Sequence, residues 1–386
     1  TYFSMFGQCV ILALIQLGGL GLVTFATFFN IAIRKKIGLK NMNLAKESVN
    51  SDSAYDVAHL IKMIFAITII IEVLGALSLA TVFIPEYGID GMFISLFLAV
   101  SAYCNAGFDI LGFKGEYSSL TTYSDNPTVL ITIALLIICG GLGFIVWQDL
   151  YAARKTKRLT LHSKIVIWVT VTLIVAGAIC FAIFEWNNNG TIGKMSVGDK
   201  VLNSFFMSVT ARTAGFNSVP IEGMFDISKL FTIILMFIGA APGSTGGGIK
   251  VTTFLVLIST VICVFRGKDE TIIHNRKVDK SVIYKALAVV TAALMAVIVS
   301  TATIYFTSKS EGIALSEIDT IFETVSAFGT VGLSSGVTGL VSTGSRLALI
   351  LTMFIGRVGP VSLALSLALA TQNKNTIVPE AKIMVG

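Results

Sequence analysis

The apolar segments of this chain come in two lengths, and this alternation constrains its fold more than any other feature. An α-helix needs about 20 apolar residues to cross the hydrocarbon core of a bilayer, and seven segments are long enough. Three others are too short to cross and are predicted to be half-helices that enter the membrane and turn back. The long segments are 5–33, 57–84, 128–152, 163–185, 230–265, 281–306 and 345–371, and the short ones are 91–103, 201–211 and 317–328.

Composition agrees with a membrane protein. Hydrophobic residues make up 54% of the chain and charged residues 13%, whereas about 25% charged residues is usual in soluble domains. We therefore predict an all-α polytopic membrane protein. The long segments carry no catalytic constellation, such as paired Asp or a Ser with a base, so we predict that the chain is not an enzyme and has no covalent cofactor.

Basic residues set the predicted orientation. They cluster in the connections 34–46, 154–164 and 266–280, and such clusters mark the cytoplasmic side of membrane proteins. This explanation of the net charge of +6 is simpler than nucleic-acid binding, which we do not expect. The half-helices are then predicted to enter from the outside.

Each short segment ends at a copy of one four-residue phrase, here called a filter phrase. Glycine in its third position tolerates backbone angles closed to other residues, so consecutive carbonyls could face one axis and replace the hydration shell of a cation. The negative C-terminal end of a half-helix would favour that cation. The predicted filter residues are Asn105, Ala106, Gly107 and Phe108, then Thr213, Ala214, Gly215 and Phe216, then Thr330, Val331, Gly332 and Leu333.

A second glycine phrase recurs in the long segments, at 18–21, 140–143, 239–243 and 356–359. Counted back from these copies, the filter partner of the first would precede Thr1. We therefore predict pseudo-fourfold repeats of membrane helix, pore half-helix, filter loop and membrane helix. The predicted units are 1–47 (second half of the first), 48–160, 161–278, and 279–386 with a C-terminal tail.

The third unit departs from the others at a run here called the gate loop. Proline and several glycines cannot sustain a helix, so the segment must break there, and unwound backbone at this depth should lie against an aqueous pathway. Close helix packing is the alternative; a phosphate-binding loop is disfavoured because Ile249 separates Gly248 from Lys250. The loop comprises Gly239, Ala240, Ala241, Pro242, Gly243, Ser244, Thr245, Gly246, Gly247 and Gly248.

Charged residues within the apolar segments are further candidates. Arg357 lies mid-segment, where insertion costs roughly 2.5 to 3.5 kcal/mol, and is predicted to face the pathway below the filter and pair with gate-loop carbonyls. Its alternative is a structural pairing with a buried acid. Arg212 is predicted to support the filter from behind, against a carboxylate such as Asp109. Lys250 would cap the gate loop or face the cytoplasmic vestibule.

The sequences SAYCNAGFD, TARTAGFNS, SAFGTVGLSS and GAAPGSTGGGIK resemble the KtrB/TrkH/HKT superfamily of potassium transporters, and the overall pattern resembles its bacterial KtrB branch. The resemblance covers essentially the whole chain. It implies a multi-pass protein of the bacterial plasma membrane in which K⁺ passes a filter of backbone carbonyls and the intramembrane loop gates conduction. It also implies a homodimer and a cytoplasmic nucleotide-binding regulatory ring of the KtrA type.

The predicted function is thus that of a channel-like potassium uptake subunit, with modulation by Na⁺ left open. The alternative is a Na⁺-coupled secondary cation symporter with a midplane binding site. That fold usually has paired breaks in inverted halves, whereas these repeats are parallel. The choice between K⁺ and Na⁺, and the first unit's filter residue, are also left open.

Overall fold

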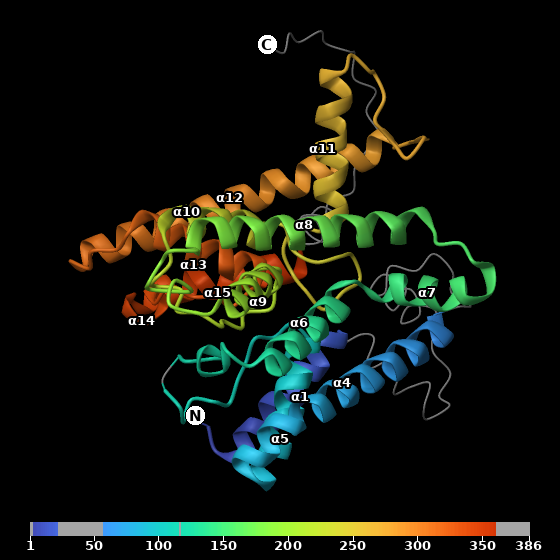
Figure 1. Ribbon diagram of the computed structural model, residues 1–386. Helices are drawn as coiled ribbons and strands as arrows, with labels where there is room; N and C mark the ends of the chain where they lie inside the picture. Colours follow the sequence, from blue (N-terminus) through green and yellow to red (C-terminus); the bar gives the residue numbers. More distant parts are fainter. Residues whose placement is uncertain (1–2, 22–56, 116, 360–386) are drawn as a thin grey trace.

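The computed structural model describes residues 3–21, 57–115 and 117–359, whose regular secondary structure is almost entirely α-helical (Figure 1). A short hairpin pairs β1 (Ile272–Ile273) with β2 (Arg276–Lys277), antiparallel. The helices are α1 (Met5–Leu20), α4 (Val57–Tyr87), α5 (Ile89–Tyr103), the 3₁₀ turn η1 (Thr121–Tyr123), α6 (Pro127–Gly141), α7 (Phe144–Thr156), α8 (Leu161–Glu185), α9 (Val197–Thr210), α10 (Asp226–Phe237), α11 (Val251–Phe265), α12 (Lys280–Ser310), α13 (Glu317–Gly329), α14 (Val337–Leu340) and α15 (Thr343–Val358).

Three described helices are long and apolar enough to cross a membrane: the Ile61–Tyr87 part of α4, α8 and α12. Large side chains on their outer faces are exposed, including Trp168 and Ile183 on α8 and Phe306 on α12. Such surfaces are expected where lipid is the solvent. The predicted long segments 5–33 and 345–371 are described only as α1 and α15, because their other ends lie outside the described residues.

The three predicted half-helices are present as α5, α9 and α13. Each carries an acid in its first turn: Asp90, Asp199, and Glu317 with Asp319. A carboxylate there is favoured by the positive end of the helix dipole. In α9 the Ser196 side chain also accepts from the Asp199 amide, which fixes where the helix begins.

The packing of these helices recurs along the chain. Helix α5 packs between α4 and α6, α9 packs against α8, and α13 packs against α12 and α15. The helix after a filter phrase also lies on the next half-helix, as α6 does on α9 and α10 on α13, and α1 lies on α5 in the same way. Figure 1 shows the blue and teal helices below the green, orange and red ones. This order brings the ends of the three half-helices together.

The division of the chain into four units, with its boundaries, stays a prediction. The predicted 47/48 boundary, the basic connection 34–46 and the tail 372–386 lie outside the described residues.

The segment 128–152, predicted as one membrane span, is broken at its glycine phrase, Gly140 to Gly143. The segment bends by 92° between α6 and α7. Gly143 has a φ of 88°, which ends α6, and the Phe144 amide then donates to the Gly243 carbonyl at 2.8 Å. The gate loop of another predicted unit is therefore inserted at the bend and supplies a hydrogen bond that a continuous helix would make internally.

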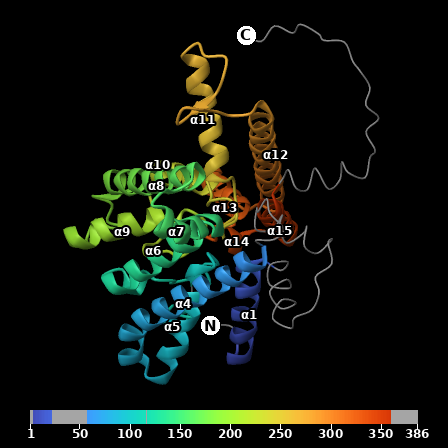
Figure 2. The same ribbon diagram turned by 90° about the vertical axis from the view of Figure 1, so that its right-hand side faces the viewer.

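The predicted break in the third unit is present. Helix α10 ends at Phe237 and α11 begins at Val251. The Gly239 amide donates to the Ile249 carbonyl at 2.8 Å, and the Ile249 amide to the Phe237 carbonyl at 3.3 Å, so the two ends of the gate loop are joined. Helix α11 contacts α12 and projects beyond the other helices (Figure 2).

Candidate ion pathway

The three filter phrases lie side by side in chain order. A Cβ atom added at Gly107 would stand 2.3 Å from the Ala214 carbonyl oxygen, and one added at Gly215 would stand 2.3 Å from the Val331 carbonyl oxygen. Each carbonyl thus occupies the space that a side chain on the preceding phrase's glycine would need. Phrases about a hundred residues apart in sequence form one continuous cluster.

Each phrase is also held to its own half-helix by the same bond. The amide of its second residue donates to a carbonyl near the helix end: Ala106 to Ser101 at 2.8 Å, Ala214 to Thr210 at 3.0 Å and Val331 to Ser326 at 2.9 Å. The first and third residues have positive φ in every copy, from 51° at Asn105 to 94° at Gly332. This left-handed backbone ends the helix and is most easily adopted by glycine.

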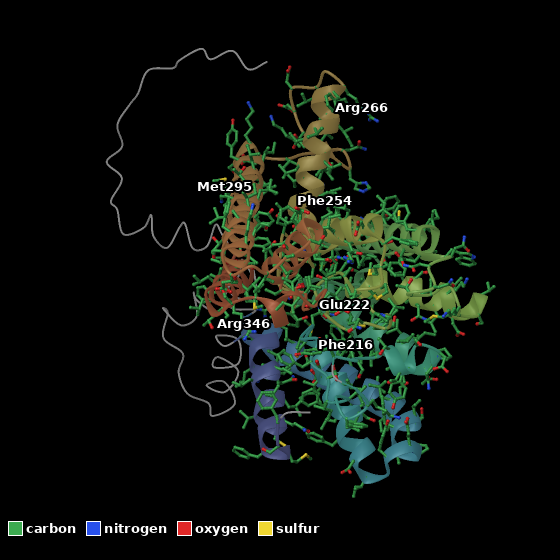
Figure 3. The ribbon with its side chains drawn as sticks, turned by 90° about the vertical axis from the view of Figure 1, so that its left-hand side faces the viewer. Phe216, Glu222, Phe254, Arg266, Met295 and Arg346 are labelled. Atoms are coloured by element: carbon green, nitrogen blue, oxygen red, sulfur yellow. The ribbon has the colours of Figure 1, made fainter. Side chains whose placement is uncertain are left out.

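A hydroxyl side chain of each half-helix bonds the third or fourth residue of its phrase. The sequence analysis did not predict these contacts. Ser101 Oγ donates to the Phe108 carbonyl at 2.7 Å, and Thr210 Oγ1 to the Phe216 carbonyl at 2.5 Å. In the last copy, Ser326 Oγ accepts from the Gly332 amide at 3.2 Å. The sequence pattern that could have predicted these contacts is a Ser or Thr five or six residues before the glycine of each phrase. Figure 3 shows Phe216 well inside the molecule, where it is fully buried.

The gate loop packs directly against the first residues of two phrases. A Cβ atom at Gly246 would lie 2.2 Å from Thr213 Oγ1, and one at Gly247 would lie 2.2 Å from Thr330 Oγ1. Thr245 Oγ1 donates to the Tyr103 carbonyl, the last of α5, at 3.2 Å. The loop therefore lies at the end of the phrases nearest the half-helices, and its glycines permit that close approach.

Three cationic side chains donate to carbonyls of the gate loop. Lys250 Nζ reaches Gly246 at 2.7 Å, which is the predicted capping contact. Arg357 Nη1 donates to Thr245, as expected from the sequence, while its Nη2 donates to the Gly18 carbonyl of α1 at 2.8 Å. Arg212 Nη2 donates to Gly239 at 3.3 Å.

The carboxylate partner predicted for Arg212 was wrong. Asp109 instead accepts from the Leu111 amide at 2.9 Å. Arg212 precedes its filter phrase whereas Asp109 follows its own, so the two residues lie at opposite ends of their phrases.

Glu72, in the middle of α4, is buried and accepts from Gln16 Nε2 at 3.3 Å. Cys104 Sγ lies 3.8 Å from its other carboxylate oxygen. These contacts tie α4 and α1 to the residue just before the first described phrase. Glu72 therefore has a hydrogen-bonded position between helices.

Taken together, the long apolar helices, the half-helices between them and the convergent glycine turns define a polytopic membrane protein of the transporter class. Residues 1–377 match the TrkH family, described as a cation transport protein. The chain belongs to this family, and it is a multi-pass plasma membrane protein rather than an enzyme.

The alignments with curated relatives extend over nearly the whole chain. It is 40% identical to Ktr system potassium uptake protein B of Bacillus subtilis, across 100% of this chain and 84% of that protein. It is 38% identical to the potassium/sodium uptake protein NtpJ of Enterococcus hirae, across 98% and 83%. The crystal structure of the potassium transporter TrkH from Vibrio parahaemolyticus matches with a TM-score of 0.67 at 16% identity, across 94% of this chain and 72% of that one, so it shows the same fold.

Proposed function

We propose that this chain is the membrane subunit of a potassium uptake system. In this proposal K⁺ passes a filter lined by backbone carbonyls of the three filter phrases, and the gate loop obstructs the path next to them. The observation that carries the proposal is the contact of Gly246 and Gly247 with the hydroxyls of Thr213 and Thr330. A loop packed against the filter phrases could control the exit of K⁺ from the filter.

The filter role follows from backbone chemistry. A cation sheds its water only where other oxygens replace it, and inward carbonyls of several phrases would do so. The half-helices α5, α9 and α13 end at the phrases, so their negative dipole ends point toward the same place. The local bonds that the phrase amides donate to the carbonyls of Ser101, Thr210 and Ser326 would keep the filter carbonyls from relaxing into a helix.

The gating role follows from the loop's backbone and charges. Residues 239–248 have no helical hydrogen-bond ladder, so the loop can move without unwinding a helix. Arg357 fastens it to α1 and places a positive charge beside it, and that charge would repel a cation below the filter. Release of the Arg357 contact would both free the loop and move the charge.

Partners and ions are proposed from the relatives. Proteins named as parts of a Ktr system support a regulatory partner, which we propose to be a cytoplasmic nucleotide-binding ring of the KtrA type acting on a homodimer. The name of NtpJ includes sodium, so Na⁺ is proposed as a second transported or modulating ion.

A flux assay tests the proposal. The purified chain is reconstituted in liposomes loaded with K⁺, and efflux is followed with and without Na⁺ on either side. We expect passive K⁺ flux that follows the K⁺ gradient and needs no Na⁺ gradient. Flux that requires Na⁺ in fixed stoichiometry would instead establish the symporter alternative, and protein-free liposomes give the background.

A further inference from the structure

Arg212 lies between the filter and the gate loop. It immediately precedes Thr213, the first residue of a filter phrase, and its Nη2 donates to the carbonyl of Gly239, the first residue of the loop. The side chain is 7% exposed. The Gly239 amide in turn bonds Ile249 at the far end of the loop. One guanidinium thus joins a filter phrase to the point where the gate loop closes on itself.

Arg212 also lines a small cavity. Among the described residues, Arg212 Nε and Thr170 Oγ1 are buried and make no hydrogen bond. Both residues line a cavity of about 10 Å³ together with Gly141 and Ala240. Thr170 belongs to α8 and is 4% exposed. The remaining lining side chains are apolar: Ile137, Ile138, Ile174 and Val209.

The size and polarity of the cavity fit one water molecule. A cavity of roughly 10 to 15 Å³ holds one water, which needs at least two polar partners. Here the partners are the Nε donor of Arg212 and the hydroxyl oxygen of Thr170, because the other lining side chains are apolar. A water that accepts from the first and donates to the second would give each group a hydrogen-bond partner.

We propose that one buried water bridges Arg212 Nε to Thr170 Oγ1 and holds the guanidinium on the Gly239 carbonyl, so that Arg212 couples the third unit's filter phrase to the gate loop. Arg212 is then a positioning residue that does not touch the ion. This inference rests on the proposed loop-gated K⁺ flux. Loss of the bridge would let the guanidinium leave Gly239 and would loosen the loop.

The test compares Thr170→Val, which removes the hydroxyl at nearly constant volume, with the wild type in K⁺-loaded liposomes. We expect resting K⁺ flux to rise roughly two- to fivefold, as for the loss of one hydrogen bond. Thr170→Ser, which keeps the hydroxyl, should raise it less. The matched control is Thr172→Val, an exposed threonine of the same helix, which should leave flux unchanged.

A double variant separates coupling from general damage. If the hydroxyl acts through Arg212, Thr170→Val should add nothing to the flux of Arg212→Gln. Additive effects would overturn the coupling. Arg357→Ala is measured beside them: if it raises flux while Thr170→Val matches the wild type, the inference fails and the proposed gate stands. If Arg357→Ala has no effect, the proposed gate itself fails.

A high-resolution density map of the wild-type protein gives a readout that does not depend on flux or on a variant folding. We expect one isolated peak within hydrogen-bond distance of Arg212 Nε and Thr170 Oγ1. A map without that peak would overturn the proposal. So would anomalous signal at the site after exchange of chloride for bromide, because the occupant would then be an anion.

Discussion

The filter phrases and the gate loop lie in contact but are held in place in opposite ways. Each phrase is fastened by its own half-helix, through bonds that span four to seven residues, such as Ala106 to Ser101 and Ser101 to Phe108. The gate loop occurs once, and distant residues hold it: Tyr103, Gly140 and Arg357 all bond Thr245. The filter is thus a local structure in repeated copies, whereas the loop depends on contacts between units.

This difference suggests how one part can move while the other stays fixed. Local bonds re-form within each phrase whatever the other units do. The contacts of the loop require α5, α6 and α15 to keep their relative positions, so a small shift of any of them would release it. We therefore expect filter substitutions to abolish flux and gate-loop substitutions to raise it.

The largest effect is expected from Gly215→Ala. Gly215 has a φ of 87° and faces the Val331 carbonyl, so an added Cβ strains the backbone and displaces a filter carbonyl. We expect K⁺ flux to fall by at least about tenfold. The matched variant is Gly332→Ala, where the nearest atom is 3.5 Å away; its loss should be smaller. Equal losses would mean that the contact between phrases has no role.

The next effect is expected from Arg357→Ala, which removes both bonds that tie the gate loop to α1. Hydrogen bonds from charged groups contribute about 1.5 to 3 kcal/mol, so resting K⁺ flux should rise by at least about tenfold. The control is Arg346→Ala on the same helix, whose guanidinium donates to the Gly339 carbonyl at an exposed position. Unchanged flux in well-folded Arg357→Ala would contradict the gate.

A smaller rise is expected from Gly246→Ala. The added methyl group would lie 2.2 Å from Thr213 Oγ1, so the loop must move away from the filter while its three cationic contacts remain. Flux should increase by about threefold, the effect of one lost contact. Gly198→Ala serves as the control, because its nearest neighbouring atom is 3.9 Å away. A rise in the control but not in Gly246→Ala would argue against the packed loop.

The smallest effect is expected from Lys250→Met, which keeps the length of the side chain and removes its bond to the Gly246 carbonyl. The two ends of the gate loop are already joined by the hydrogen bond from the Gly239 amide to the Ile249 carbonyl. Flux should therefore rise by no more than about twofold. Lys268→Met, at an exposed position beyond α11, is the control. A rise as large as that of Arg357→Ala would mean that Lys250 is a principal tie of the loop.

Periodicity and glycine spacing predicted the features that short segments encode. The three half-helices, their acidic first turns and the break at residues 239–248 agree with the structure. The cationic contacts of Arg357 and Lys250 were also expected, because carbonyls of an unwound loop need donors.

The features that were missed depend on partners distant in sequence. The glycine phrase at 140–143 marks where the segment after α6 breaks, but no pattern within 128–152 reveals that the Phe144 amide donates to the Gly243 carbonyl at the 92° bend. The same holds for Arg212, whose partner proved to be Gly239 rather than a carboxylate. Thr170 had no sequence signal, since a threonine within an apolar helix is common.

The most direct test of the account combines the two regions in one protein, Gly215→Ala with Arg357→Ala. If the filter and the gate loop lie in series on one pathway, opening the gate cannot restore the passage of ions through a damaged filter. K⁺ efflux from liposomes containing the double variant should then be as low as that of Gly215→Ala alone. Efflux as high as that of Arg357→Ala alone would contradict the account, because ions would then pass without crossing the filter.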